Sequence, residues 1–169
     1  ETVHRFHPVV SAILNITPDH LNRHHTMECY AHTKERIAEN QTKDDVCVLN
    51  MEDEELYRFG SECKASVVWF SSKRKPDKGA YLDGDDIRYT DGTQDKLMLN
   101  IHDMNLLGTH NYENVCAAIA MTKAVGIPDD IIIEQVKCFK AVEHRIEYVA
   151  TKKGVWYYND SKGTNPEAS

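Results

Sequence analysis

The chain has 169 residues, enough for one domain with a buried core, and 41% of them are hydrophobic and 28% charged. This balance is typical of a globular protein and argues against a disordered chain. The formal net charge is −7 with lysine and arginine scattered along the chain, which disfavours a nucleic-acid-binding face, and no apolar run approaches the ~20 residues of a membrane helix.

The first half of the chain alternates strand-like and helix-like segments. Residues 9–16, VVSAILNI, form a near-continuous apolar run of strand length, as in buried parallel strands. Residues 26–41 predict a helix with Thr26 as its N-cap. A strand, a short helix and a further strand are then predicted at 45–53, 54–63 and 65–71. This order indicates an α/β fold with a mostly parallel sheet flanked by helices.

The second half begins with a different pattern. Residues 79–100 contain two Asp-Gly pairs between alternating apolar residues, which predicts a small appended antiparallel sheet. Residues 110–126 predict the strongest helix, ended by Gly126, and 127–142 a second helix opened by Pro128. The apolar face expected on the stronger helix comprises Val115, Ala118, Ile119, Thr122 and Val125. Residues 145–160 predict a hairpin.

Five cysteines are present, an odd number, with no Cys-x-x-Cys pair. Buried free thiols in a reducing cytoplasm are therefore expected. The first residues show no basic-then-apolar layout of a signal peptide.

Polar residues follow the first predicted strand in NITPDHLNRH, residues 15–24. Ligands of open α/β sheets bind at the carboxyl ends of the strands, where this segment falls. Asp19 with His20, His24 and His25 could hold a metal ion, or these histidines could simply face solvent.

Lys34 lies one helix length further on. A lysine on a helix is usually a solvated charge, and a functional role requires that its amine point back at the loop. In a desolvated site the amine could become neutral and react with carbon dioxide, giving an anion that helps to hold Mg²⁺.

Three later segments could bind a nucleotide. Asn111 and Asn114 lie one helical turn apart after Gly108. They could bind a nucleobase, Asn111 could cap the helix, or both could hold. In EHRIE, residues 143–147, an arginine could bind phosphate or lie free on the surface. The segment NDSKGTN, residues 159–165, follows a strand; if it is extended, its alternate side chains share one face.

Four segments, taken together and in chain order, closely resemble the successive motifs of the central domain of the Mur ligases, over essentially the whole chain. They are NITPDHLNRH…YAHTK, GTHNYENVCAAIA, EHRIE and NDSKGTN. The last motif resembles that of the member that adds D-glutamate. Sister ligases and folylpolyglutamate synthase carry different sequences there. The resemblance implies ATP-dependent amide formation in peptidoglycan precursor synthesis, joining D-glutamate to UDP-N-acetylmuramoyl-L-alanine through an acyl phosphate.

The resemblance also implies a role for each motif. His20 is expected to bind Mg²⁺, and Lys34 to be carbamylated and to support that metal. Asn111 and Asn114 are expected to contact ATP.

The later motifs complete the implied nucleotide site. His144 and Arg145 are expected to bind ATP, with Arg145 reaching its phosphates. Asp160 is expected to hold the ribose hydroxyls, while Lys162 and Thr164 face the reacting phosphate and acyl groups.

One family feature has no counterpart in this sequence. None of the eight glycines belongs to a G-x-x-x-x-G-K-[ST] phosphate loop. Residues 1–169 are therefore expected to be the later part of the central domain, without the phosphate-loop segment, the N-terminal UDP-binding domain and the C-terminal domain. Such a chain is expected to be inactive alone. The expected partners are the two substrates, with no nucleic acid and no membrane, and a monomer is expected. A ligase that adds another amino acid, or a non-catalytic nucleotide- or metal-binding module, are the alternatives.

Overall fold

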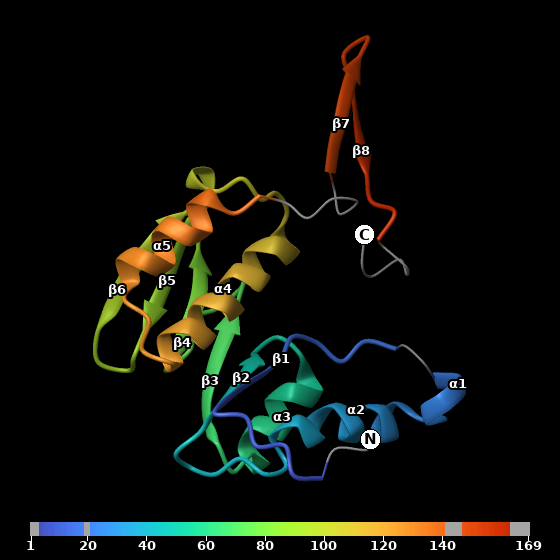
Figure 1. Cartoon of the computed structure of the whole chain (residues 1–169), viewed down its shortest axis with the longest axis vertical. Helices are drawn as coiled ribbons and strands as arrows, with labels where there is room; N and C mark the ends of the chain where they lie inside the picture. Colours follow the sequence, from blue (N-terminus) through green and yellow to red (C-terminus); the bar gives the residue numbers. More distant parts are fainter. Residues whose placement is uncertain (1–3, 19–20, 141–146, 163–169) are drawn as a thin grey trace.

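The computed structural model describes residues 4–18, 21–140 and 147–162. Its main feature is a six-stranded sheet whose strands follow one another in chain order (Figure 1). The strands are β1 Val10–Ile13, β2 Val46–Asn50, β3 Ser66–Ser71, β4 Gly79–Asp83, β5 Asp86–Thr90 and β6 Asp95–Asn100. Neighbouring strands from β1 to β4 are parallel, whereas β5 and β6 are antiparallel to their neighbours. A separate two-stranded antiparallel sheet confirms the predicted hairpin and completes the expected fold class.

Helices cover both faces of the main sheet (Figure 1). The α-helices are α1 Leu21–His24, α2 Met27–Glu35, α3 Glu54–Glu62, α4 Thr109–Ala124 and α5 Asp129–Cys138, with 3₁₀ turns η1 Arg36–Ala38 and η2 Ile101–Asp103. Alternate residues of β2 point to opposite faces. Cys47 and Leu49 pack in a core cluster with α2 and α3, whereas Val48 packs in a second cluster with α4 and α5.

Local signals placed several boundaries correctly. The hydroxyl of Thr26 accepts a hydrogen bond from the N–H of Cys29, so Thr26 is the N-cap of α2 as predicted. Gly126, with φ of 79°, follows the end of α4. The first Asp-Gly pair forms the tight turn between β4 and β5, where Gly84 has φ of 60°. Of the five free cysteines, Cys47 and Cys116 are buried as expected. Cys29 and Cys138 are exposed, contrary to the expectation, and Cys63 is partly buried.

The antiparallel strands predicted at 79–100 are present, but as β4, β5 and β6 of the main sheet rather than as a sheet of their own. They extend the main sheet, because β4 pairs with β3 and aligns Gly79 with Trp69. Gly79 makes this close approach possible, since a Cβ atom there would lie 1.8 Å from the carbonyl oxygen of Trp69. The separate antiparallel sheet is instead formed by β7 Glu147–Lys152 and β8 Val155–Asn159.

The buried face of α4 is also broader than predicted. Its buried residues are Val115, Cys116, Ala117, Ile119 and Ala120, whereas Ala118 and Val125 are exposed. The reason is that α4 lies across the sheet and also packs beside α5, so contacts come from two directions. Among the described residues, no helix has the length and apolar character needed to cross a membrane.

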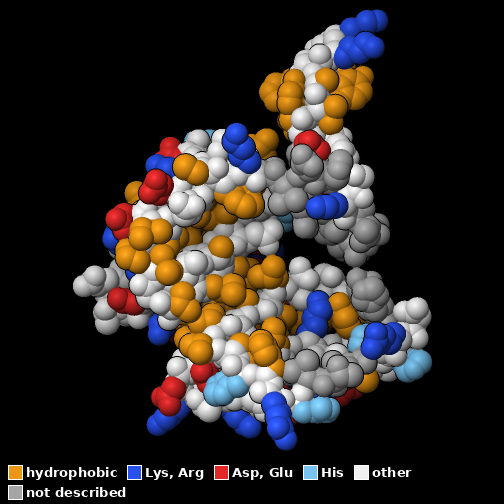
Figure 2. Space-filling model, in the orientation of Figure 1, with side chains coloured by type: hydrophobic (Ala, Val, Ile, Leu, Met, Phe, Trp, Pro, Cys, Tyr) orange, Lys and Arg blue, Asp and Glu red, His pale blue; other side chains and the backbone are white. Residues whose placement is uncertain are grey.

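The surface shows where apolar side chains stay uncovered. Figure 2 shows them over α5 and on the β7–β8 hairpin. On the hairpin, the exposed large side chains are Tyr148, Val149, Val155, Trp156, Tyr157 and Tyr158. The hairpin is therefore far less buried than the main sheet, in which Val48 and Leu49 have no exposed surface.

Candidate functional site

Two candidate segments lie at the carboxyl edge of the parallel strands, one on each face of the sheet. The segment that leaves β1 runs beside α2 and α3. The first turns of α4 are tied to the end of β3, because the hydroxyl of Ser72 donates a hydrogen bond to the carboxylate of Glu113. This edge is where open α/β sheets bind their ligands.

Lys34 points back at the segment after β1, as a functional role requires. Its Nζ atom donates a hydrogen bond of 2.9 Å to the carbonyl oxygen of Asn15. The same Nζ lies 4.7 Å from the ring centroid of Tyr30, within the range of a cation–π interaction. Tyr30 is 7% exposed, so its ring is fixed by the core and packs against the side chain of Lys34. Lys34 is therefore held in one direction, although its proposed chemical modification stays a prediction.

Among the residues that the structure describes, the histidines after β1 form no metal centre. His24 packs its ring against Tyr30, with the two centroids 5.2 Å apart. His25 has φ of 63° in the turn between α1 and α2. Asp19 and His20 lie outside the described residues. Within the described ranges, no three His, Cys, Asp or Glu side chains converge in a way that could hold a metal ion.

The start of α4 contributes two amide side chains to one cavity. Gly108, with φ of 93°, is the N-cap of α4, so the alternative prediction that Asn111 caps the helix is wrong. Asn111 lies within the first turn instead, and its Nδ2 donates a hydrogen bond of 2.7 Å to the carbonyl oxygen of Leu107. Asn111 and Asn114 are one turn apart on the same side of α4, as expected.

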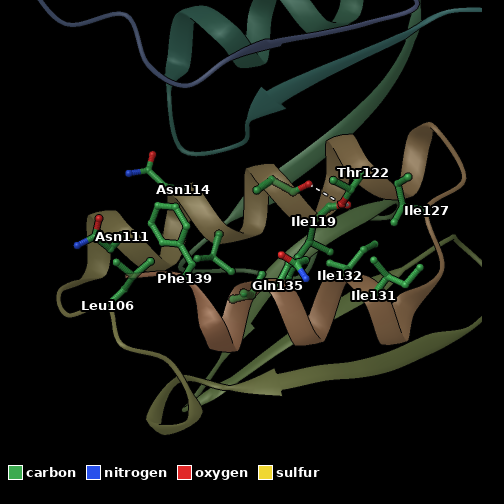
Figure 3. A pocket seen from close by; sticks show the side chains of 13 residues that line it. Leu106, Asn111, Asn114, Ile119, Thr122, Ile127, Ile131, Ile132, Gln135 and Phe139 are labelled. Atoms are coloured by element: carbon green, nitrogen blue, oxygen red, sulfur yellow. Dashed lines mark hydrogen bonds between the residues drawn. The ribbon is translucent and has the colours of Figure 1, made fainter. Parts of the chain in front are cut away.

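The cavity beside these amides lies between α4 and α5 and has a volume of about 450 Å³. Figure 3 shows Asn111, Asn114 and Phe139 at one end and Ile127 and Ile131 at the other. Its walls are mainly aliphatic. Such a cavity suits a flat, weakly polar group whose edge can reach the two amides.

A second cavity, of about 650 Å³, lies between the start of α4 and the β7–β8 hairpin. Asn111 lines it together with Glu147, Tyr148 and Tyr158 of the hairpin. The hairpin therefore lies beside the start of α4. His144, Arg145 and Thr164 lie outside the described residues.

The exit from β8 differs from the sequence-based expectation. Residues 161–162 form a turn rather than an extended segment, and the N–H of Ser161 donates a hydrogen bond of 3.1 Å to Oδ1 of Asn159. Asp160 and Lys162 therefore do not project from alternate positions of one straight strand. The physical reason is local, because an asparagine side chain readily closes a turn two residues further on. Asp160 is partly buried and Lys162 is exposed.

Sequence reasoning missed two further residues at the β1 exit, Asn50 and Asp53. Asn50 donates a hydrogen bond to the carbonyl oxygen of Leu14, and Asp53 accepts one from the N–H of Ile16. An N-cap signal at Asp53 was available in the sequence, since two glutamates follow it and begin a helix. Its second bond, to a residue 37 positions earlier, left no local signal.

Comparison with known proteins decides the family. The model of the Mur ligase middle domain matches residues 1–122. The chain belongs to the Mur ligase middle-domain family. A UDP-N-acetylmuramoylalanine–D-glutamate ligase from Lachnospira eligens is 82% identical to this Mur ligase chain over 169 residues, covering 100% of it and 38% of the relative. A ligase of the same name from Lachnoclostridium phytofermentans is 52% identical, covering 100% of this chain and 37% of the relative.

Solved structures support the same fold. MurF from Acinetobacter baumannii superimposes with a TM-score of 0.72 at 18% identity, covering 95% of this chain and 35% of MurF. MurF ligase from Thermotoga maritima, solved in complex with ADP, gives a TM-score of 0.68 at 21% identity, covering 95% and 37%. This Mur ligase chain thus spans well under half the length of the relatives that it matches.

Proposed function

We propose that this chain is the later part of the middle domain of an ATP-dependent ligase that adds D-glutamate to UDP-N-acetylmuramoyl-L-alanine. The observation that carries the proposal is the 82% identity, over the full length of the chain, to a UDP-N-acetylmuramoylalanine–D-glutamate ligase. On this proposal the phosphate loop, the UDP-binding domain and the C-terminal domain belong to the rest of the protein. The protein acts in the cytoplasm as a monomer, without nucleic acid or membrane partners.

The nucleotide is proposed to bind where α4 begins. Asn111 and Asn114 stand at one end of an apolar cavity, and amides of this kind can bond the edge of a purine. Asp160 is assigned to the ribose hydroxyls, because a carboxylate readily accepts hydrogen bonds from hydroxyl groups. His144 and Arg145, in the connection before β7, are assigned to ATP. Arg145 is assigned to its phosphates, because a guanidinium can bind two phosphate oxygens at once.

Mg²⁺ is also part of the proposal, but the described residues alone do not supply its ligands. No three metal-ligating side chains converge in the described ranges, and an unmodified lysine at position 34 would repel a cation. We therefore assign the metal to His20 and to a carbamylated Lys34, in which the added carboxylate replaces the positive charge. The direction of Lys34, towards the segment after β1, agrees with this assignment.

The proposed chemistry has two steps. The terminal carboxylate of UDP-N-acetylmuramoyl-L-alanine attacks the γ-phosphorus of ATP, and ADP leaves. The amine of D-glutamate then attacks the acyl phosphate, and phosphate leaves after the amine has lost a proton. Both steps bring negative groups together, so cations at the reaction centre lower the barrier. Lys162 is assigned the role of such a cation. Thr164 is assigned to donate a hydrogen bond from its hydroxyl to the reacting groups.

The full-length protein tests the proposal directly. Incubation with ATP, UDP-N-acetylmuramoyl-L-alanine and D-glutamate should release phosphate and yield a product heavier by one glutamyl residue. L-Lysine, meso-diaminopimelate and L-alanine in place of D-glutamate should give no product. A product with one of these amines would support a ligase that adds another amino acid. ATP binding without turnover, in the presence of all substrates, would support a non-catalytic nucleotide-binding module.

The 169-residue chain alone offers a second test. Without a phosphate-loop lysine it should neither hydrolyse ATP nor bind it tightly, because only base and ribose contacts are available. Calorimetric titration of this chain with ATP and Mg²⁺ measures this. Tight, Mg²⁺-dependent binding would contradict its assignment as part of a larger nucleotide site.

A further inference from the structure

The backbone that leaves β1 is held by side chains from other elements. We name residues 14–16 the β1-exit segment. The ladder between β1 and β2 ends at Ile13, so this segment lies beyond the sheet pairing. Asn50, at the end of β2, donates a hydrogen bond of 3.0 Å to the carbonyl oxygen of Leu14. Asp53 accepts a hydrogen bond of 2.6 Å from the N–H of Ile16.

Both side chains are themselves fixed at a second point. The other carboxylate oxygen of Asp53 accepts from the N–H groups of Glu55 and Leu56, each at 3.1 Å, and so caps α3. Leu56 has no exposed surface, which anchors this first turn of α3 in the core. The Oδ1 atom of Asn50 accepts from the N–H of Glu52 at 2.9 Å. Neither side chain is therefore free to follow the β1-exit segment if it moves.

The residue between these two contacts is the one that Lys34 reaches. The carbonyl oxygen of Asn15 accepts the hydrogen bond from Nζ of Lys34. Three consecutive residues are thus each bonded by a side chain from a different element, β2, α2 and the start of α3. Asn50 is 8% exposed and Ile16 is 7% exposed, so two of the contacts are shielded from water. A hydrogen bond to a charged group is stronger than one between neutral groups.

We propose that Asn50 and Asp53 are positioning residues, which set the direction of the chain as it leaves β1 and thereby the placement of Asn15 opposite Lys34. We assign them no direct contact with substrate or nucleotide. Their effect on catalysis passes through the β1-exit segment, whose continuation carries the residues assigned above to the metal. This part of the inference rests on the proposed function, whereas the restraint on the backbone does not.

Asp53→Ser separates the two bonds of Asp53. Serine is as good an N-cap as aspartate, so α3 keeps its first turn, but its shorter side chain cannot also reach the N–H of Ile16. Ser66→Ala is the matched control, because Ser66 donates a single side-chain bond to the carbonyl oxygen of Lys43. Asn50→Ser is a second variant that loses the bond to Leu14 and tests the same restraint independently.

Hydrogen exchange of the full-length protein measures the restraint without any activity. In Asp53→Ser the Ile16 amide should exchange at least about 10-fold faster, the factor expected when a bond to a charged acceptor is lost. Ser66→Ala should leave this amide unchanged, and both variants should unfold at similar urea concentrations. The inference would be overturned if the Ile16 amide exchanged at the wild-type rate in both Asp53→Ser and Asn50→Ser.

Ligase kinetics measure the consequence. Asp53→Ser should lower kcat by about 10-fold and raise the Mg²⁺ concentration for half-maximal rate, while KM for D-glutamate changes less than about twofold. A general loss of folded protein would instead lower the active fraction and leave the Mg²⁺ requirement unaltered. Faster exchange at Ile16 with unchanged kcat and Mg²⁺ requirement would refute the positioning role. A wild-type protein without ligase activity would refute the proposed function, and the exchange result would stand by itself.

Discussion

Gly60, in the middle of α3, provides a test in which two physical effects have opposite signs. Alanine is about 1 kcal/mol more favourable than glycine inside a helix, so Gly60→Ala should stabilise the protein on propensity alone. The structure opposes this. A Cβ atom at position 60 would lie 2.4 Å from Cη2 and 2.7 Å from Cζ2 of Trp69. These separations are far below van der Waals contact, so the ring or the helix must move.

The Trp69 ring has little room to move. It packs against Tyr57, with the ring centroids 5.4 Å apart, and Leu49 on the next strand is completely buried. Overpacking of this kind costs about 1–3 kcal/mol. Taking about 2 kcal/mol for the overlap and about 1 kcal/mol for the gain in propensity, Gly60→Ala should lower the free energy of unfolding by about 1 kcal/mol.

A second substitution removes the opposing effect. Trp69→Phe deletes the part of the indole that contains Cη2 and Cζ2, so in this background Gly60→Ala should stabilise by up to about 1 kcal/mol. The double-mutant cycle should therefore show a coupling of about 2 kcal/mol. Urea unfolding followed by far-ultraviolet circular dichroism measures all four proteins, with Ser61→Ala as a control for helix propensity. Stabilisation by Gly60→Ala in the wild-type background would show that the ring yields freely and would refute the reasoning.

On the proposed function, Lys34→Ala in the full-length protein should abolish ligase turnover, and added acetate should restore part of it in steady-state assays. The exposed Lys43 should tolerate alanine, whereas a fully active Lys34→Ala variant would return Lys34 to an ordinary surface role. Lys162→Ala should raise the activation free energy by about 3 kcal/mol and so lower kcat roughly 150-fold, with KM for ATP nearly unchanged. A raised KM for ATP with normal kcat would instead make Lys162 a ground-state binding group. The ammonium of Lys75, bonded to the carboxylate of Asp95, lowers the pKa of Asp95 to about 2 from its usual 3.8. Because the pKa of Asp95 is lower in the folded than in the unfolded state, this stabilisation is present above about pH 4 and is lost as the pH falls towards 2. The urea midpoint of Asp95→Asn should therefore fall less steeply with decreasing pH than that of the wild type. Equal pH dependence of the two midpoints would contradict the assignment.

The sequence by itself determined the features that depend on neighbouring residues. The hydroxyl of Thr26 caps α2 because the N–H groups that it satisfies lie within the next turn. Gly84 marks the tight turn after β4 because few other residues accept a left-handed backbone. The motifs that point to the Mur ligases are likewise short and contiguous. Such signals survive in a sequence because the physical interactions behind them span only a few residues.

Tertiary structure alone decided which distant segments meet. The pairing of β4 with β3 and the broad buried face of α4 were not foreseen from local patterns. The same holds for the β1-exit segment, where Asn50 and Asp53 reach residues 36 and 37 positions away. Alternating or helical periodicity identifies the face that a residue occupies, but not the partner on that face. That partner depends on how the whole sheet and its helices pack, and only the folded chain specifies it.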